Sequence, residues 1–298
     1  MLIEAPLRRK NEIEPLIEAG ADIFYCGVMT DQKINNRHNT ILHQFRNMSE
    51  LHDAIELIHS YGKTIYLTLN STNIDVEKAL QEASIAIEGG IDGFIITDYI
   101  LIKEIRKIYQ STAIHLSVLS NMFNSSCIQP FYDIGINGFC FERNMMIGNM
   151  NLINKKYPML ESTAFISGNC SYTQTLCKLH GFSTRSLIYM DEGGAGELVC
   201  EGWQCSQQSD ESYVNNLNAP HWCGLCSLPL LQDAGVKNLK IEGRSLDTKY
   251  KIKKVKYIKA ALDALDNYHG EEYIAYCKER YEKEFGSQCK SRSCYYRI

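Results

Sequence analysis

The segment Ile13–Gly27, with the sequence IEPLIEAGADIFYCG, contains the unit that decides the fold. A stretch with helical spacing of apolar residues leads to Gly20, and a short apolar run follows directly. The glycine stands where a helix must end and the chain must turn back towards a strand. This position favours a residue that is free to adopt a positive φ. The unit therefore predicts a helix followed by a buried strand.

The same unit recurs as LHDAIELIHSYGKTIYLTLN (51–70), SIAIEGGIDGFIITD (84–98), FYDIGINGFCFER (131–143) and PLLQDAGVKNLKIEGR (229–244). Its apolar runs are rich in β-branched and aromatic residues, as in strands that are covered on both faces. Strands that alternate with helices predict parallel β-α units, and eight such units predict a (β/α)8, TIM-like barrel. The alternative is a doubly wound open sheet, although no Gly-rich phosphate fingerprint follows the first strand. The expected strands are Leu2–Ala5, Asp22–Cys26, Thr64–Leu69, Gly93–Thr97, Ile114–Ser117, Gly138–Phe141, Ser162–Ile166 and Asn238–Ile241.

The repeat breaks down in a cysteine-rich segment, 168–226, which we interpret as an insertion between the seventh and eighth strands. This insertion lies on the face where barrels place their chemistry, and a long irregular loop there is usually functional. We assign residues 1–267 to the barrel, including this insertion. Residues 268–298 are expected to form a C-terminal helix and a frayed end.

Composition limits the function classes. The chain has 298 residues, 45% of them hydrophobic, and a formal net charge of −4, so it shows no global signature of a nucleic-acid-binding protein. The basic stretch Lys249–Lys259 is expected to be the solvated face of a helix. The N-terminus shows no secretory signal, and no apolar stretch approaches the ~18 residues of a membrane span. A cytoplasmic location is expected.

Twelve cysteines are many for a reducing compartment, where clustered cysteines indicate metal binding or catalysis rather than disulfides. Six of them fall between positions 170 and 226. Thiolates suit both iron–sulfur clusters and zinc, so spacing alone leaves an iron–sulfur site, a zinc site and no metal open. Cys26 and Cys140 lie in strand runs and Cys127 in a helix, and these three are expected in the core.

Several motifs resemble the U-thirty-two, or collagenase-like, peptidase family over residues 1–265. The resemblance starts with the opening strand and IEAGADIFYCG, continues through MSELHDAIELIHSYGKTIYLTLNS, and includes His115, Ser117 and Asn124. Its clearest part is KIEGR, in which Lys240, Glu242, Gly243 and Arg244 agree with the family motif. The sequence departs from the family pattern at Leu119, Asn144, Thr175 and His180, where the family has glutamine, glutamate, glycine and serine.

The resemblance implies a barrel that carries a 4Fe-4S cluster on Cys170, Cys177, Cys205 and Cys223, with Cys200 and Cys226 as rivals for the last two. It also implies an oxygen-independent hydroxylase or related redox enzyme that draws its oxygen atom from prephenate. Two alternatives remain: a peptidase or peptide-modifying enzyme, and a non-catalytic, cluster-bearing subunit of a heterodimer. No HExxH or GxSxG motif supports the peptidase. The substrate remains open between a small molecule, RNA and a peptide.

The expected catalytic residues are Glu242, Arg244, Arg143 and His115, which follow or end barrel strands. Arginine can hold a carboxylate in a bidentate manner, and Glu242 can orient Arg244 or exchange a proton. Two structural alternatives stand beside this hypothesis. The Lys240, Glu242 and Arg244 run can be an ion-pair network, and His115 can be a core residue. Other side chains expected at the barrel mouth are Tyr25, Asn70, Asp98, Ser117 and Asn124.

Overall fold

The structure is a computed structural model that describes residues 1–29, 44–70, 74–143, 145–168, 222–244, 246–286, 288–289 and 294–296. Its strands are β1 (Leu2–Pro6), β2 (Ile23–Cys26), β3 (Thr64–Leu69), β4 (Gly93–Ile96), β5 (Ala113–Leu116), β6 (Gly138–Cys140), β7 (Glu161–Gly168), β8 (Trp222–Cys223) and β9 (Asn238–Ile241).

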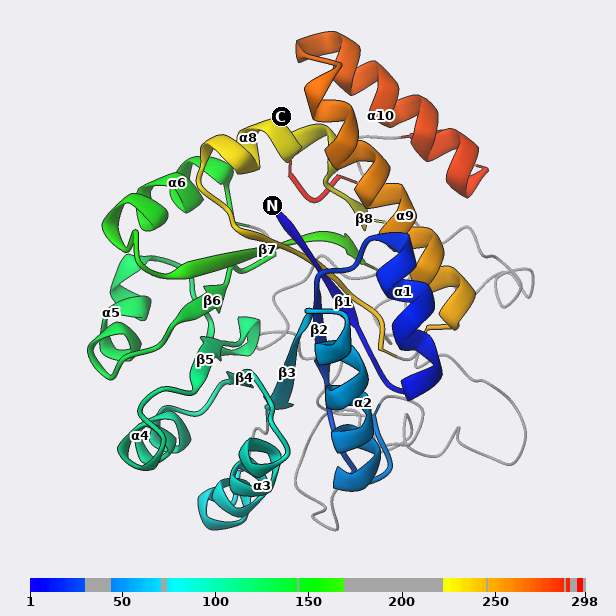
Figure 1. The fold of residues 1–298 in the computed structure, drawn as a ribbon. Helices are drawn as coiled ribbons and strands as arrows, with labels where there is room; N and C mark the ends of the chain where they lie inside the picture. The colour runs from blue at the N-terminus through cyan, green and yellow to red at the C-terminus, as the bar shows by residue number, and fades with distance from the viewer. Residues whose placement is uncertain are drawn as a thin grey trace, which may run out of the picture.

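Eight of these strands form a closed parallel barrel. Strands β1 to β6 pair in sequence order, β6 pairs with β7, and β9 closes the ring between β7 and β1. Figure 1 shows the helices around the outside of this ring. The predicted TIM-like barrel is therefore confirmed, and the open-sheet alternative is excluded by the β6–β7 pairing.

Helices separate most successive strands: α1 (Ile13–Ala19), α2 (Met48–Ser60), α3 (Val76–Glu88), α4 (Tyr99–Ile108), α5 (Ser125–Asp133), α6 (Ile147–Lys156), α8 (Leu228–Asp233), α9 (Thr248–Asp263) and α10 (Gly270–Phe285). Gly20 ends α1 with a φ of 110°, and the other four glycines of the recurring unit also have positive φ. The unit seen in the sequence is thus the α-to-β turn of the barrel.

The helices cover the barrel with narrow apolar stripes. In α4, for example, Leu101, Ile102 and Ile105 are fully buried, while Asp98 caps the helix by accepting a hydrogen bond from the Leu101 amide at 2.8 Å. None of the helices in the described part of the chain has the length and apolar character that a bilayer crossing requires.

One strand was not predicted. β8 pairs antiparallel with the end of β7, so that Ser167 faces Cys223. The last described residues return to this edge, because the Tyr295 amide donates to the Cys223 carbonyl at 3.0 Å and the Tyr296 hydroxyl donates to the Phe165 carbonyl at 2.7 Å. Both tyrosines are buried. The prediction of a frayed end is therefore wrong for residues 294–296, which the packing of these two rings holds against the barrel.

The basic stretch Lys249–Lys259 forms most of α9, but it is not a single solvated face. Lys251 and Lys254 are fully buried, whereas Lys249, Lys253, Lys256 and Lys259 are exposed. The prediction that these lysines are solvated is wrong for Lys251 and Lys254, because lysines occur on both the buried and the exposed side of this helix. α10 packs beyond α9 on the outside of the barrel (Figure 1).

Candidate functional site

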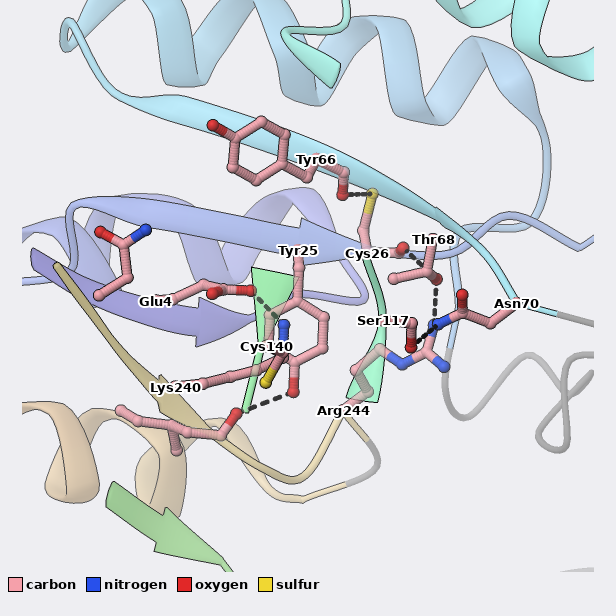
Figure 2. A network of polar contacts seen from close by, with 12 residues as sticks. Glu4, Tyr25, Cys26, Tyr66, Thr68, Asn70, Ser117, Cys140, Lys240 and Arg244 are labelled. Carbon is pink, nitrogen blue, oxygen red and sulfur yellow. Dashed lines mark hydrogen bonds and ion pairs between the residues drawn. The ribbon is translucent and has the colours of Figure 1, made fainter. Parts of the chain in front are cut away.

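A fully paired charge occupies the barrel interior below the mouth. The Lys240 ammonium forms an ion pair with Glu4 and lies 3.8 Å from the centre of the Tyr25 ring. The Tyr25 hydroxyl donates to the Ile241 carbonyl at 2.8 Å, and burial raises the pKa of Tyr25. Figure 2 shows these contacts among residues of β1, β2 and β9. For Lys240 the structure matches the ion-pair alternative that the sequence left open.

The mouth holds a second, less complete set of charges after β6. Arg143 forms an ion pair with Glu242 through Nη2, and its guanidinium carbon lies 4.1 Å from the centre of the Phe165 ring. Only 2% of the Arg143 side chain is exposed, yet its Nε and Nη1 have no hydrogen-bond partner among the described residues. The structure therefore brings together two of the predicted site residues and leaves N–H donors unused between them.

Glu142 is a site residue that sequence reasoning missed. Both of its carboxyl oxygens are buried and have no hydrogen-bond partner in the described part of the chain. Burial raises the pKa of Glu142, and the adjacent positive charge of Arg143 partly opposes this change. The sequence position of Glu142 could have indicated it, because this residue directly precedes Arg143 after a predicted strand.

Arg244 reaches the mouth from the end of β9. Its Nη1 donates to the Thr68 hydroxyl at 3.2 Å, as Figure 2 shows, and burial lowers its pKa. A Cβ at residue 27 would lie 2.6 Å from this nitrogen, so only glycine lets the arginine approach the backbone so closely. Arg244 therefore occupies a fitted position above β2 and β3.

The other residues expected at the mouth divide into two groups. Asn70 and Ser117 join Thr97 in a chain of hydrogen bonds of 3.0 Å each across the ends of β3, β4 and β5. Asp98 and Asn124 instead cap α4 and α5. The capping residues have a local structural role that explains why they are polar.

His115 lies apart from the other three predicted catalytic residues. Its Nε2 is 3.9 Å from a carboxyl oxygen of Glu161, the first residue of β7, and its ring centre is 4.7 Å from that of Tyr66. Burial, together with the charge of Lys240, lowers the pKa of His115 to about 4. The histidine thus faces the amino-terminal end of the barrel, opposite the mouth, as the core alternative expects.

Of the four expected cluster ligands, Cys223 alone falls within the described residues; Cys170, Cys177, Cys205 and the rival Cys200 lie outside them. The Cys223 thiol lies 3.6 Å from the Tyr257 hydroxyl, and burial raises its pKa to about 12. Within the described part of the chain, no three His, Cys, Asp or Glu side chains form a group that can hold a metal ion. The rival Cys226 has its pKa lowered to about 7, chiefly by a hydrogen bond from Cys277.

The cysteines expected in the core are mostly found there. Cys26 and Cys140 are buried, and the thiol of Cys26 donates to the Tyr66 carbonyl at 3.7 Å (Figure 2). Cys127 lies in α5 as predicted, but it is only half-buried.

A buried lysine lies near Cys223. Lys254 is fully buried, and its Nζ has no hydrogen-bond partner among the described residues. Its Nζ lies 4.9 Å from the centre of the Tyr250 ring. Burial lowers the pKa of Lys254 to about 7, while the charge of Cys223 acts in the opposite direction. An isolated buried ammonium is unfavourable, so this position requires an explanation.

Comparison with proteins of known sequence finds relatives named tRNA hydroxylation protein P. The protein from Helicobacter pylori (strain ATCC 700392 / 26695) is 26% identical over 290 residues, which cover 89% of this chain and 64% of the relative. The Escherichia coli (strain K12) protein is 25% identical over 206 residues, which cover 66% of this chain and 42% of the relative. This chain therefore spans less than two thirds of the length of these relatives.

Comparison with solved structures supports the fold. A U32 peptidase structure matches with a TM-score of 0.51 and 11% identity, over 82% of this chain and 93% of the other. A ribulose-1,5-bisphosphate carboxylase/oxygenase from Pyrococcus horikoshii matches with a TM-score of 0.54 and 9% identity, over 96% of this chain and 64% of the other. At such low identity these likenesses show the barrel alone. The sequence model described as Peptidase family U32 matches residues 8–296, and this chain therefore belongs to that family.

Proposed function

We propose that this chain hydroxylates tRNA by a reaction that does not use O2, and that prephenate supplies the oxygen atom. A 4Fe-4S cluster and the charged residues at the barrel mouth would form one site. The proposed cluster ligands are Cys170, Cys177, Cys205 and Cys223.

The observation that carries this proposal is the position of Ser167. Its carbonyl accepts a hydrogen bond from the Glu242 amide at 3.0 Å on one side, and it pairs with Cys223 on the other. Adjacent strands lie ~4.8 Å apart, so the backbones of Glu242 and Cys223 are separated by roughly 10 Å. The backbone of this cluster ligand would therefore lie two strand spacings from Glu242, which pairs with Arg143.

The residues around Cys223 fit a negatively charged metal centre. Lys254 is a buried amine without a hydrogen-bond partner among the described residues, and a negative charge at Cys223 would raise its pKa. Thiolates bound to iron would give this ammonium a counter-charge. When bound, such a cluster supplies one-electron redox chemistry, with a potential that depends on nearby charges and hydrogen bonds.

The mouth offers groups for an anionic oxygen donor. Arg143 has two nitrogen atoms without a hydrogen-bond partner among the described residues, and Arg244 provides a second guanidinium, so a carboxylate group can be bound by charge-assisted hydrogen bonds. Burial raises the pKa of Glu142, so this carboxyl group would hold a proton more readily than an exposed glutamate does. These residues would bind and orient the donor and exchange a proton with it.

The choice of tRNA over a peptide or another small molecule is supported by the names of the curated relatives. A heterodimer with a second family member remains a prediction.

The test is an anaerobic reconstitution with iron and sulfide, followed by incubation with tRNA and prephenate. We expect about four irons per chain, since four thiolates hold one 4Fe-4S cluster. We also expect digested nucleosides that gain the mass of one oxygen atom. A Cys223→Ser variant should lose both iron and hydroxylation, whereas Arg143→Lys should keep iron and lose most hydroxylation.

Two outcomes would overturn the proposal. Protein that binds no iron and sulfide lacks the cluster. Loaded protein that leaves tRNA unchanged, but cleaves or modifies a peptide in a parallel assay, supports the peptidase alternative instead.

A further inference from the structure

We propose that Lys254 and Tyr257 on α9 form the outer environment of the Cys223 metal centre and set its reduction potential. This inference rests on the proposed cluster and assigns a function to two residues outside the charged groups at the mouth. It explains a buried charge that the interactions among the described residues leave unpaired.

Both side chains belong to one face of α9. They are three residues apart, which places them side by side on a helix surface, and both are almost completely buried. The Tyr257 hydroxyl lies 3.6 Å from the Cys223 sulfur. This contact shows that the face on which Lys254 lies is turned towards the expected ligand.

The direction of the Lys254 side chain agrees with this placement. Its ammonium lies 4.9 Å from the ring of Tyr250, one turn nearer the start of α9. Because α9 follows β9, the start of the helix lies at the carboxyl end of the barrel strands, where β8 and Cys223 are found. The charge is thus aimed at the end of the barrel that carries the proposed cluster.

A neighbouring lysine shows that a buried lysine on this helix can be fully paired within the protein. Lys251, three residues earlier on α9, is also fully buried, but its ammonium donates to Glu12 at 2.9 Å. The Lys254 ammonium lies over the Tyr250 ring, and no carboxylate pairs with it among the described residues; a thiolate at Cys223 would raise its pKa. A dianionic thiolate–iron centre would be its natural counter-charge.

This arrangement has a defined effect on redox chemistry. Reduction adds negative charge to the cluster, so a buried positive charge and a hydroxyl that donates to a ligand sulfur both favour the reduced state. Removal of either group should move the midpoint potential to a more negative value. The lysine should have the larger effect because it carries a full charge.

The experiment compares the reconstituted wild type with Lys254→Met, Tyr257→Phe and, as a control, the double variant Glu12→Leu, Lys251→Met, which removes a complete buried ion pair from the same helix. Midpoint potentials are measured by anaerobic titration followed by visible absorbance or electron paramagnetic resonance. We expect the potential to fall in Lys254→Met, to fall less in Tyr257→Phe and to stay at the wild-type value in the double variant. Lys254→Arg, which keeps the charge, should stay close to the wild type.

The outcomes separate this inference from the proposed function. A loaded Lys254→Met protein with the wild-type potential overturns the inference and leaves the cluster intact. Wild-type protein that takes up no iron overturns both. If Lys254→Met fails to retain iron and Lys254→Arg retains it, the requirement for the charge is supported by iron content instead of potential.

Discussion

Two groups of buried charges in this barrel differ in how completely they are paired. The first lies between the β1–α1 connection and α9, where the Glu12 carboxylate is fully buried. It accepts hydrogen bonds from the backbone and side chain of Arg8 at 3.2 Å, and from Thr248 and Lys251 at 2.9 Å. This group is complete within the described residues and fastens α9 to the barrel.

The second group lies around the mouth and β8. Here Glu142, Arg143 and Lys254 are buried, but each has polar atoms without a hydrogen-bond partner among the described residues. Burial of unpaired polar atoms is costly, so such atoms are rare unless a ligand or other group satisfies them. The comparison teaches that burial of a charge does not by itself indicate function; at the mouth, the unused hydrogen-bonding capacity of the buried charges makes them candidates for ligand binding.

The largest effect is expected when Glu12, the shared partner of the completely paired group, is removed. We expect Glu12→Ala to lower the free energy of unfolding by about 3–5 kcal/mol, because Lys251 is left as an uncompensated buried charge. Urea unfolding of the iron-free protein measures this change. A Glu12→Leu, Lys251→Met double variant should recover most of the loss, since apolar replacements of a buried pair are often neutral.

Lys254→Met is the matched control for that experiment. It removes a charge that lacks a carboxylate partner in the described residues, so the iron-free variant should be at least as stable as the wild type. A loss of stability as large as that of Glu12→Ala would mean that Lys254 is paired in the folded chain, and the two groups would no longer differ.

The next test concerns His115, which we place with the structural residues. Its pKa of about 4 in the folded protein lies below the ordinary value of 6.5, so the unfolded chain binds more protons in the interval between them. The stability that the neutral ring contributes is complete above pH 6.5 and is lost as the pH falls towards 4. The loss amounts to about 3 kcal/mol.

Urea unfolding at several pH values between 7 and 4 checks this dependence. A His115→Gln variant should show a flatter pH profile than the wild type, because its side chain does not titrate. If both proteins lose the same stability, burial does not depress the pKa of this ring. A role for His115 in proton exchange would then be open again.

Arg143→Lys tests the incomplete group directly. Lysine can keep an ion pair with Glu242, but it cannot reproduce the planar fork of N–H donors. We expect the variant to remain folded, since the charge that pairs with Glu242 is kept. In contrast, kcat/KM for prephenate should fall about 100-fold, the effect of losing a charge-assisted hydrogen bond of about 2–3 kcal/mol. An unchanged kcat/KM would remove Arg143 from the donor site.

Much of the fold could be predicted from the sequence because its signals are local. The helix, glycine and apolar run of Ile13–Gly27 fix an α-to-β turn within a few residues, and the repetition of this unit fixes the barrel. β8 has two residues and pairs across a long separation, so it has no periodic pattern to detect. The return of Tyr295 to the Cys223 backbone is equally non-local.

The candidate site could be predicted only in part. Arg143 follows β6 and Glu242 follows β9, the two strands that flank β7, and their position at the carboxyl ends of strands brings them together. His115 was placed at the wrong end, because the stagger of the strands, which sets it beside Glu161, is not visible in one strand's sequence. Lys254 lies in a stretch whose lysines are distributed around the whole helix, so the sequence does not reveal which of them is buried; tertiary packing determines this.

The smallest test asks whether Asn124, which the sequence placed at the mouth, belongs to either group of charges. Its side chain accepts hydrogen bonds from the amides of Ser126 and Cys127 at 2.9 and 3.2 Å, so it satisfies donors that the start of α5 would otherwise leave unpaired. Asn124→Ala should cost about 1 kcal/mol, and Asn124→Asp should restore most of it. Thermal unfolding measures both changes. Hydroxylation per folded molecule should be equal in all three proteins, because a cap acts on its own helix. A variant with normal stability and weak hydroxylation would instead show that Asn124, which follows β5, belongs to the incompletely paired group at the mouth.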